Sequence, residues 1–215
     1  MGSGPQALGP AATLLLIRHA VTPLNEQNRI QAWDDVDINL VRGQEDTLKT
    51  AQYLQGAPIF EIVTSDLARA EQTGEVLANQ MFVPISSDRN LRPWDLGKLA
   101  AMRFADIQAD VDYYIEHSSK QIPGGERFND FIERWHEGLQ GLVARAMQSP
   151  TGAIAAVTHS RNIEATRYLL SGSKDSKSMA KANSVPPSGV MALRIQDGRL
   201  REIPFRNDHL SKEDE

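Results

Sequence analysis

The hydrophobic positions of the chain gather first into short, nearly unbroken runs. Residues 13–18 (TLLLIR), 59–64 (IFEIVT) and 153–158 (AIAAVT) show this pattern, and a weaker version spans residues 83–87. Apolar runs of this length, bounded by turn-forming or polar residues, are typical of buried strands. We therefore predict strands at these four places.

Between these runs the hydrophobic spacing changes to that of helices. Helices are predicted for residues 40–55, from a cap at Ser65 to about residue 80, and for residues 161–170. The most regular helix is predicted for residues 126–148, where apolar side chains form one stripe: Phe128, Phe131, Ile132, Trp135, Leu139, Leu142, Val143 and Ala146. Strands that alternate with helices predict an α/β fold, with helices on both faces of a mostly parallel sheet.

The end of this pattern predicts a loop and a hairpin. Gly172–Pro187 is rich in Ser, Lys and Gly and is predicted to be a loop. Residues 190–195 and 200–205 are predicted to pair as two strands around the turn Asp197-Gly198.

The chain shows no internal repeat and no linker, so we expect a single domain over residues 13–205. Residues 1–12 are interpreted as a disordered leader or a cloning remnant, and residues 206–215 as a charged, solvated tail. Residues 98–122 lack a clean period and predict an excursion that could act as a lid over a site.

Composition narrows the function classes. The formal net charge is -5, which argues against a general nucleic-acid binder, and the chain has no cysteine. A disulfide framework, a thiolate metal site and a cysteine nucleophile are therefore excluded. The longest aliphatic run, Leu14–Ile17, is too short to cross a bilayer. We expect no membrane partner and, by default, a cytoplasmic location.

Two of the predicted strands end in histidine. His19 follows the first strand and His159 follows the strand at 153–158. Ligands of open α/β sheets bind beyond the carboxyl ends of the strands. If the two strands are neighbours, these imidazoles meet at one edge. Arg69, in the first turn of the helix after the second strand, approaches the same edge.

These residue types suit phosphoryl transfer. A neutral imidazole such as that of His19 is a competent nucleophile, and nearby arginines disfavour its protonation. Arg18 and Arg69 can each grip a phosphate with a planar guanidinium, while His159 can donate to a nonbridging oxygen. A single histidine at a strand end is more often structural, and that interpretation is given to the others: His117, His136 and His209.

The chain resembles the histidine phosphatase (phosphoglycerate mutase-like) superfamily in an ordered set of motifs. The motifs are RHAVTPLN (18–25), RIQAWDD (29–35), TSDLARA followed by QT (64–73), PGGE (123–126) and VTH (157–159). The resemblance implies a three-layer α/β/α sandwich with a mostly parallel sheet. It also implies that His19 is the phosphorylated nucleophile and that Arg18, Arg69 and His159 complete the phosphate pocket. Further matching positions at the phosphate or the substrate are Thr22, Asn25 and Gln31.

Several positions depart from the family pattern. Ala20 and Ala32 stand where the family usually has glycine, which can adopt positive φ and allows close backbone approach. The second histidine is usually followed by glycine, but here Ser160 and Arg161 follow. Arg161 is either an added cation that faces the substrate or an exposed residue of a first helical turn, and both interpretations stay open.

The largest departure concerns the proton donor. In the branch that this chain resembles, a glutamate commonly stands at the position of Pro93, and proline has no proton to give. A leaving alkoxide normally needs a general acid. Asp95 lies two residues further on, which in an extended segment is the same side, and it is our candidate acid. Alternatively, Asp95 caps a turn before Gly97, or the substrate has a leaving group that needs little protonation.

We therefore predict a phosphomonoesterase that needs neither a metal nor another cofactor. The alternatives are a phosphoglycerate mutase-type phosphotransferase and a catalytically impaired protein that binds a phosphorylated ligand. The expected substrate is a phosphorylated small molecule, although a phosphoprotein also fits. Whether the chain forms a homodimer stays open.

Overall fold

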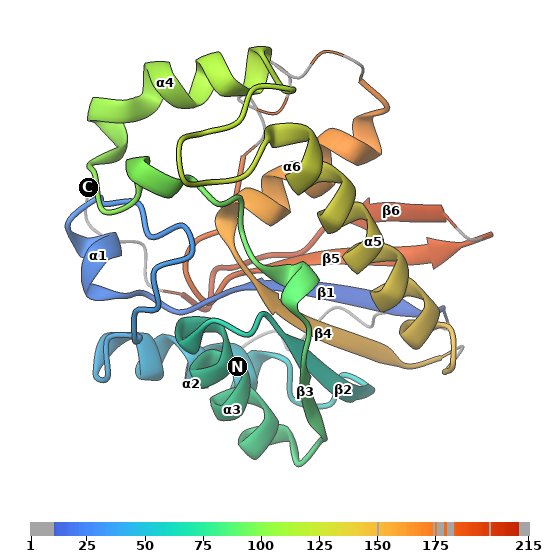
Figure 1. The fold of residues 1–215 in the computed structure, drawn as a ribbon. Helices are drawn as coiled ribbons and strands as arrows, with labels where there is room; N and C mark the ends of the chain where they lie inside the picture. Colours follow the sequence, from blue (N-terminus) through green and yellow to red (C-terminus); the bar gives the residue numbers. More distant parts are fainter. Residues whose placement is uncertain are drawn as a thin grey trace.

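The computed structural model describes residues 11–149, 151–173, 175, 179, 183–197 and 199–210. Within this part of the chain, six strands form one sheet in the order β3-β2-β4-β1-β5-β6 (Figure 1). The strands are β1 (Thr13–Arg18), β2 (Ile59–Thr64), β3 (Ile85–Ser87), β4 (Ala153–Thr158), β5 (Val190–Gln196) and β6 (Arg199–Ile203). All six were predicted, with ends that differ by at most two residues.

The sheet is parallel in its first part and antiparallel at one edge. β1 pairs with β4, and β2 pairs with β4 and β3, all in parallel. β5 runs antiparallel to β1 and forms the predicted hairpin with β6. Gly198 of that hairpin turn lies outside the described residues, as does part of the predicted loop Gly172–Pro187.

Helices cover both faces of the sheet, which confirms the three-layer α/β/α architecture (Figure 1). The helices are α1 (Pro23–Glu26), α2 (Arg42–Tyr53), α3 (Ala68–Met81), α4 (Phe104–Glu116), α5 (Phe128–Ala146) and α6 (Ser160–Ser171), with 3-10 turns at Arg89–Leu91 and Gly97–Leu99. Helices α2 and α3 lie on one face, and α5 and α6 lie on the other.

Alternate side chains of the central strand supply the two halves of the core. Leu14 and Leu16 belong to the apolar cluster that also contains Trp135 of α5, whereas Leu15 and Ile17 belong to the cluster on the α2 and α3 side. All four are fully buried. A strand buried on both faces needs a continuous apolar run, and this explains the pattern TLLLIR.

The segment 98–122 is more regular than the sequence analysis expected. It contains α4, whose buried side chains Ile107, Val111 and Ile115 recur every four residues and join the core. The pattern was hard to recognise in the sequence because this stripe is narrow and because the large apolar residues Met102, just before α4, and Phe104, its first residue, are exposed. Backbone hydrogen bonds from Ile30 N to Met102 O and from Phe104 N to Asn28 O tie the excursion to the loop after α1.

The start of the predicted tail is packed rather than solvated. The ring of His209 stacks on Tyr53 of α2 at a centroid distance of 4.4 Å, and Leu210 is only 7% exposed. Residues 1–10 and 211–215 lie outside the described residues, so the predictions for a leader and for the rest of the tail are untested. Among the described helices, none is both long and apolar enough to cross a membrane.

Candidate active site

The pairing of β1 with β4 brings the two predicted histidines together. Arg18 is in register with Thr158, so the residues that follow them, His19 and His159, leave the sheet side by side. The backbone N–H of His19 also donates to the carbonyl of Thr158 at 2.8 Å. The two rings lie 5.1 Å apart between centroids, and their residues are 4% and 3% exposed. The juxtaposition expected from the strand ends is confirmed.

The hydrogen bond of His19 determines which ring nitrogen is free to react. Nδ1 lies 2.8 Å from the carbonyl oxygen of Ala20, and because a carbonyl can only accept, Nδ1 carries the hydrogen. Nε2 of the neutral ring then keeps its lone pair. Burial lowers the pKa of His19 well below its usual value, and the charges of Arg69 and Arg18 lower it further. His19 is therefore a neutral imidazole with an unprotonated Nε2.

His159 is equally buried and equally neutral. Burial is the main cause of its strongly lowered pKa, followed by the charge of Arg69. Both ring nitrogens are buried, and neither has a hydrogen-bond partner among the described residues. Buried polar atoms are nearly always paired, so an imidazole of this kind beside His19 points to a bound polar ligand.

Arg69 is the most deeply buried charge of the site. It is the second residue of α3 and is 1% exposed, and desolvation lowers its pKa to about 10. Its two terminal nitrogens donate to the carbonyls of Asp34 at 2.8 Å and Ala32 at 2.7 Å. Its Nε has no hydrogen-bond partner among the described residues. The guanidinium thus fixes the loop 32–34 and turns a positive charge toward both imidazoles.

Ala32 carries backbone strain at a position where the family usually has glycine. Its φ is +43°, in the left-handed region that L-residues other than Gly, Asn and Asp rarely adopt. Ala20, the other alanine in a glycine position, does not adopt a positive φ and is completely buried. Gly43 of α2 makes room there, because a Cβ on it would come within 2.9 Å of the Val21 carbonyl and 3.4 Å of the Ala20 Cβ.

The start of α3 differs from the prediction. The N-cap position is Leu67, and the first free amide, that of Ala68, donates to the carboxylate of Asp35 at 2.7 Å. The hydroxyl of Ser65 is buried and has no hydrogen-bond partner in the described part of the chain. The prediction that Ser65 caps this helix was therefore wrong, because the carboxylate of Asp35, from a loop distant in sequence, accepts the first free amide instead.

Thr22 and Asn25 fix the turn that leads away from the nucleophile. The amide of Asn25 donates to Thr22 Oγ1 at 3.2 Å, and the amide of Thr22 donates to Asn25 Oδ1 at 3.1 Å, which is a reciprocal capping box for α1. Thr22 is fully buried. The two residues thus stiffen the segment that begins at His19.

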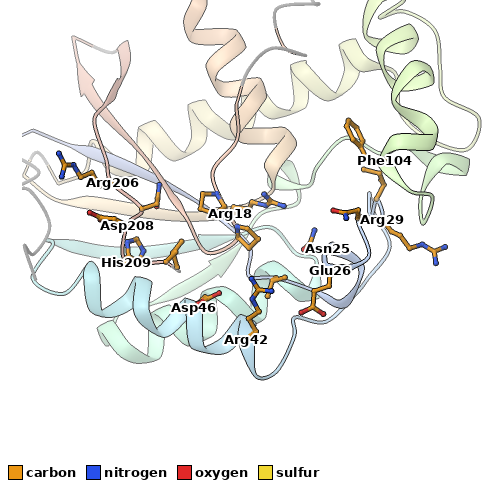
Figure 2. Close-up of a pocket in the computed structure, with 17 residues that line it drawn as sticks. Arg18, Asn25, Glu26, Arg29, Arg42, Asp46, Phe104, Arg206, Asp208 and His209 are labelled. Atoms are coloured by element: carbon orange, nitrogen blue, oxygen red, sulfur yellow. The ribbon is translucent and has the colours of Figure 1, made fainter. Parts of the chain in front are cut away.

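A cavity of about 1690 Å³ opens beside the phosphate pocket (Figure 2). Its walls come from α1, the loop after it, the start of α2 and α4, and residues 206–210. Its lining contains the cationic side chains of Arg18, Arg29, Arg42 and Arg206 and the carboxyl groups of Glu26, Asp46 and Asp208. Of the four residues predicted to bind phosphate, Arg18 lines it, whereas His19, Arg69 and His159 do not. The buried groups His19, Arg69 and His159 therefore converge outside the open cavity, and Arg18 borders both.

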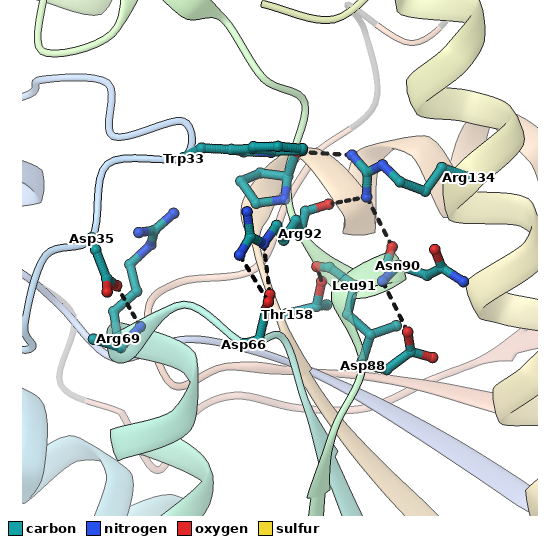
Figure 3. A network of polar contacts seen from close by, with 12 residues as sticks. Trp33, Asp35, Asp66, Arg69, Asp88, Asn90, Leu91, Arg92, Arg134 and Thr158 are labelled. Carbon is teal, nitrogen blue, oxygen red and sulfur yellow. Dashed lines mark hydrogen bonds and ion pairs between the residues drawn. The ribbon is translucent and has the colours of Figure 1, made fainter.

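Position 93 takes part in a network of polar contacts, of which Figure 3 shows Trp33, Arg92 and Arg134. Pro93 is buried, and its carbonyl accepts hydrogen bonds from Trp33 Nε1 at 2.9 Å and from Arg134 at 3.0 Å. Arg134 also pairs with Glu126 at 2.9 Å. Arg92 lies over the Trp33 ring, 4.7 Å from its centroid.

The remaining predicted residues lie in contrasting surroundings. The carboxylate of Asp95 accepts the amide of Gly97 at 3.0 Å, and burial raises the pKa of Asp95. Arg161 forms an ion pair with Glu164 of its own helix at 2.8 Å. Gln31 is 7% exposed, and its buried Oε1 has no hydrogen-bond partner among the described residues.

Sequence reasoning assigned no role to Thr73, although it quoted the residue within a motif. The hydroxyl of Thr73 accepts the amide of Ala20 at 2.9 Å and donates to the carbonyl of Arg69 at 2.6 Å. The available sequence signal was its place four residues, about one helical turn, after Arg69, whereas its burial is seen only in the structure.

Comparisons with known proteins agree with this geometry. "Probable phosphoglycerate mutase GpmB" of Salmonella choleraesuis is 26% identical over 143 residues, and the chain spans 64% of the length of that relative. A mycobacterial glucosyl-3-phosphoglycerate phosphatase complexed with VO3 is similar in structure, with a TM-score of 0.78, 24% identity and coverage of 91% of this chain and 99% of that one. Phosphoglycerate mutase from Bacillus anthracis also has a TM-score of 0.78, at 18% identity with coverage of 93% and 95%. At these identities the two structures establish the fold.

The family model settles the classification. The model of the histidine phosphatase superfamily (branch 1) matches residues 14–208, which include Arg18, His19, Arg69 and His159. The chain therefore belongs to the histidine phosphatase superfamily, branch 1.

Proposed function

We propose that the chain is a phosphomonoesterase that works through a phosphohistidine on Nε2 of His19. The observation that carries this proposal is the pair of buried, neutral imidazoles, 5.1 Å apart, with Arg69 and Arg18 as the cations that lower their pKa. A neutral nucleophile facing fixed positive charge is what transfer of a phosphoryl dianion requires.

The chemistry follows from the protonation states. The Nε2 lone pair of His19 attacks phosphorus, the bond to the leaving oxygen breaks, and the imidazole becomes phosphorylated. Water then attacks the phosphorus and the P–N bond breaks, so His19 is regenerated and inorganic phosphate is released. Arg69, Arg18 and His159 neutralise or bind the three equatorial oxygens, whose charge is greatest in the transition state. Gln31, with a buried unpaired amide oxygen, would contact the substrate.

The proposed mechanism uses no metal ion. Its positive charge comes from guanidinium groups, and among the described residues no three His, Asp or Glu side chains form a metal-ligand cluster. We expect activity to be unchanged by chelators. A phosphorylated small molecule remains the expected substrate and a cytoplasmic location remains the expectation from the sequence.

One observation favours each of the two alternative functions, the phosphotransferase and the binding protein. The relatives named probable phosphoglycerate mutase favour a phosphotransferase, in which the phosphohistidine survives long enough to phosphorylate a bound intermediate. Pro93 favours a protein that binds phosphorylated ligands without turnover. The reactive tautomer of His19 favours turnover over mere binding, but it suits a mutase and a phosphatase equally.

The proposal is tested by incubating the protein with p-nitrophenyl phosphate and a panel of sugar phosphates. We expect release of inorganic phosphate, most readily from p-nitrophenyl phosphate with its good leaving group, and, after rapid denaturation at alkaline pH, a phosphate bound to His19. A mutase would show transfer between phosphoglycerates that exceeds hydrolysis. Thermal stabilisation by these compounds without phosphate release would identify a binding protein and contradict our proposal.

A further inference from the structure

The segment around Pro93 is clamped in a conformation that offers no proton donor. Arg134 donates to the carbonyls of Asn90, Arg92 and Pro93, each at 3.0 Å, and Trp33 donates to Pro93 as well. Four hydrogen bonds to three backbone carbonyls therefore fix this segment (Figure 3). The residue that the family pattern makes an acid is therefore a buried proline ring on a rigid backbone.

The carboxyl groups around this segment already have partners that favour the ionised form. Asp66 forms a bidentate ion pair with Arg92 at 2.6 and 2.8 Å, and Arg92 lowers the pKa of Asp66. Glu126 accepts two hydrogen bonds from Arg134, both at 2.9 Å. Both carboxyl groups are thus occupied by a guanidinium, which accepts no proton from them.

Asp95 and Asp35 are engaged with backbone amides. The carboxylate of Asp95 accepts the amide of Gly97 at 3.0 Å, and the carboxylate of Asp35 accepts the amide of Ala68 at 2.7 Å. Each fixes a local turn or helix start. The raised pKa of Asp95 follows from burial first, while the Gly97 hydrogen bond acts in the opposite direction and favours the charged form.

The charges that act on the reacting imidazoles are all positive. Arg69 and Arg18 lower the pKa of His19, and Arg69, Arg134 and Arg18 lower that of His159. No carboxylate of the described residues contributes to either shift. Arg18 also faces the neighbouring cavity, whose lining contains three further arginines and three acidic residues. This surrounding stabilises a departing anion by charge rather than by protonation.

We propose, resting on the function proposed above, that the substrates are phosphoryl donors whose leaving group departs as a stable anion. Acyl phosphates and phosphoanhydrides share this chemistry, and alkyl phosphate monoesters do not. The Nε2–P bond of His19 forms as the P–O bond breaks, and its electron pair stays on a carboxylate or phosphate oxygen without a proton. In the second step both hydrogens of the attacking water leave with phosphate as H2PO4⁻, and neutral His19 returns.

The first test compares donors in the unmodified protein. Acetyl phosphate, ADP, p-nitrophenyl phosphate and glycerol phosphate are assayed for phosphate release, with His19→Ala as the blank for spontaneous hydrolysis. We expect kcat/KM for glycerol phosphate to be lower than that of the best anionic donor by about 100-fold or more, the usual contribution of a general acid. The comparison of acetyl phosphate with ADP shows whether the protein prefers an acyl phosphate or a phosphoanhydride.

The second test introduces a general acid at position 93. Pro93→Glu supplies a carboxyl group, and Pro93→Gln is the matched control with the same size and no acid. We expect Pro93→Glu to exceed Pro93→Gln by about 10-fold or more on glycerol phosphate and to match it on acetyl phosphate, because a general acid assists only poor leaving groups. Thermal melting of both variants verifies that they fold.

Three outcomes would overturn the inference. Glycerol phosphate hydrolysed as efficiently as acetyl phosphate by the unmodified protein would show that a proton donor exists. A loss on glycerol phosphate alone in Asp95→Asn would identify Asp95 as that donor. Absence of phosphate release and of phosphohistidine with every donor would overturn the proposed function together with this inference.

Discussion

The hydroxyl of Thr73 joins the loop of the nucleophile to the helix that carries Arg69, because it accepts the amide of Ala20 at 2.9 Å and donates to the Arg69 carbonyl at 2.6 Å. One side chain thus sets the spacing between His19 and its principal cation. Both hydrogen bonds are buried, so their loss would leave an unpaired amide next to the nucleophile.

We expect Thr73→Val, which keeps the shape and removes the hydroxyl, to destabilise the fold by about 1–3 kcal/mol. We also expect kcat to fall by about 10- to 100-fold with little change in KM, because the nucleophile loses its alignment rather than its substrate. Steady-state kinetics and urea unfolding measure both effects. Thr73→Ser retains the hydroxyl and should keep most of the activity; equal activity of the Val and Ser variants would remove Thr73 from the positioning of His19.

Replacing the nucleophile should be far more damaging. His19→Ala is expected to lower kcat by at least about 1000-fold and to abolish phosphohistidine formation, as removal of a covalent nucleophile does elsewhere. Phosphate release measures kcat. Phosphohistidine is measured by trapping the enzyme at alkaline pH after incubation with labelled substrate. His136 lies exposed on α5, and His136→Ala should behave like the unmodified protein. A phosphoenzyme that persists in His19→Ala would place the phosphoryl group elsewhere.

The two buried imidazoles make stability depend on pH. Burial and Arg69 lower the pKa of His19 and His159 well below 6.5, whereas the unfolded chain titrates near about 6.5. As pH falls below that value, the unfolded chain binds protons that the folded chain does not. The free energy of unfolding then decreases by up to about 1.4 kcal/mol per pH unit for each histidine, until the folded-state pKa is reached.

Urea unfolding between pH 5 and 7.5 tests this dependence. His159→Gln should reduce the slope of stability against pH below pH 6.5, and the double variant with His19→Gln should reduce it further. An unchanged slope in the double variant would mean that the imidazoles are protonated in the folded protein. The neutral form of His19 also predicts that the nucleophile stays competent below pH 6.5, which kcat at saturating substrate would reveal.

The left-handed backbone of Ala32 predicts a stabilising substitution. At φ +43° alanine is strained, and Ala32→Gly should raise the free energy of unfolding by about 0.5–1 kcal/mol after the larger chain entropy of glycine is subtracted. Ala109, in the exposed part of α4, is the matched control, and Ala109→Gly should lower stability by about 0.5–1 kcal/mol. Both are measured by thermal or urea unfolding; effects of the same sign would contradict the assignment of strain to Ala32.

The sequence predicted the strands and the chemistry of their ends better than it predicted the contacts between loops. His19 and His159 could be placed at strand ends because apolar runs stop directly before them. That β1 and β4 are neighbours depends on tertiary packing, which no local pattern specifies, and it entered the prediction as a condition. The structure satisfies that condition.

Two features that the sequence analysis missed depend on contacts between residues far apart in the sequence. Asp35 replaces Ser65 at the start of α3, and Arg134 clamps the backbone at Pro93, each across more than thirty residues of sequence. The sequence rules for helix caps and turns consider only residues close in sequence, so they cannot identify such partners. α4 was missed for a different reason, since its apolar stripe is a single row beside exposed Met102 and Phe104.

The order of the strands has a consequence for how the protein is made. Among the six described strands β1 is synthesised first, but its two neighbours in the sheet, β4 and β5, are the fourth and fifth in chain order. A nascent chain that ends before Ala153 exposes both edges of a fully apolar strand, and such edges favour aggregation. On the ribosome, β1 therefore lacks both sheet partners until β4 and β5 have been synthesised, and translation products that end before Ala153 should be insoluble rather than partly active.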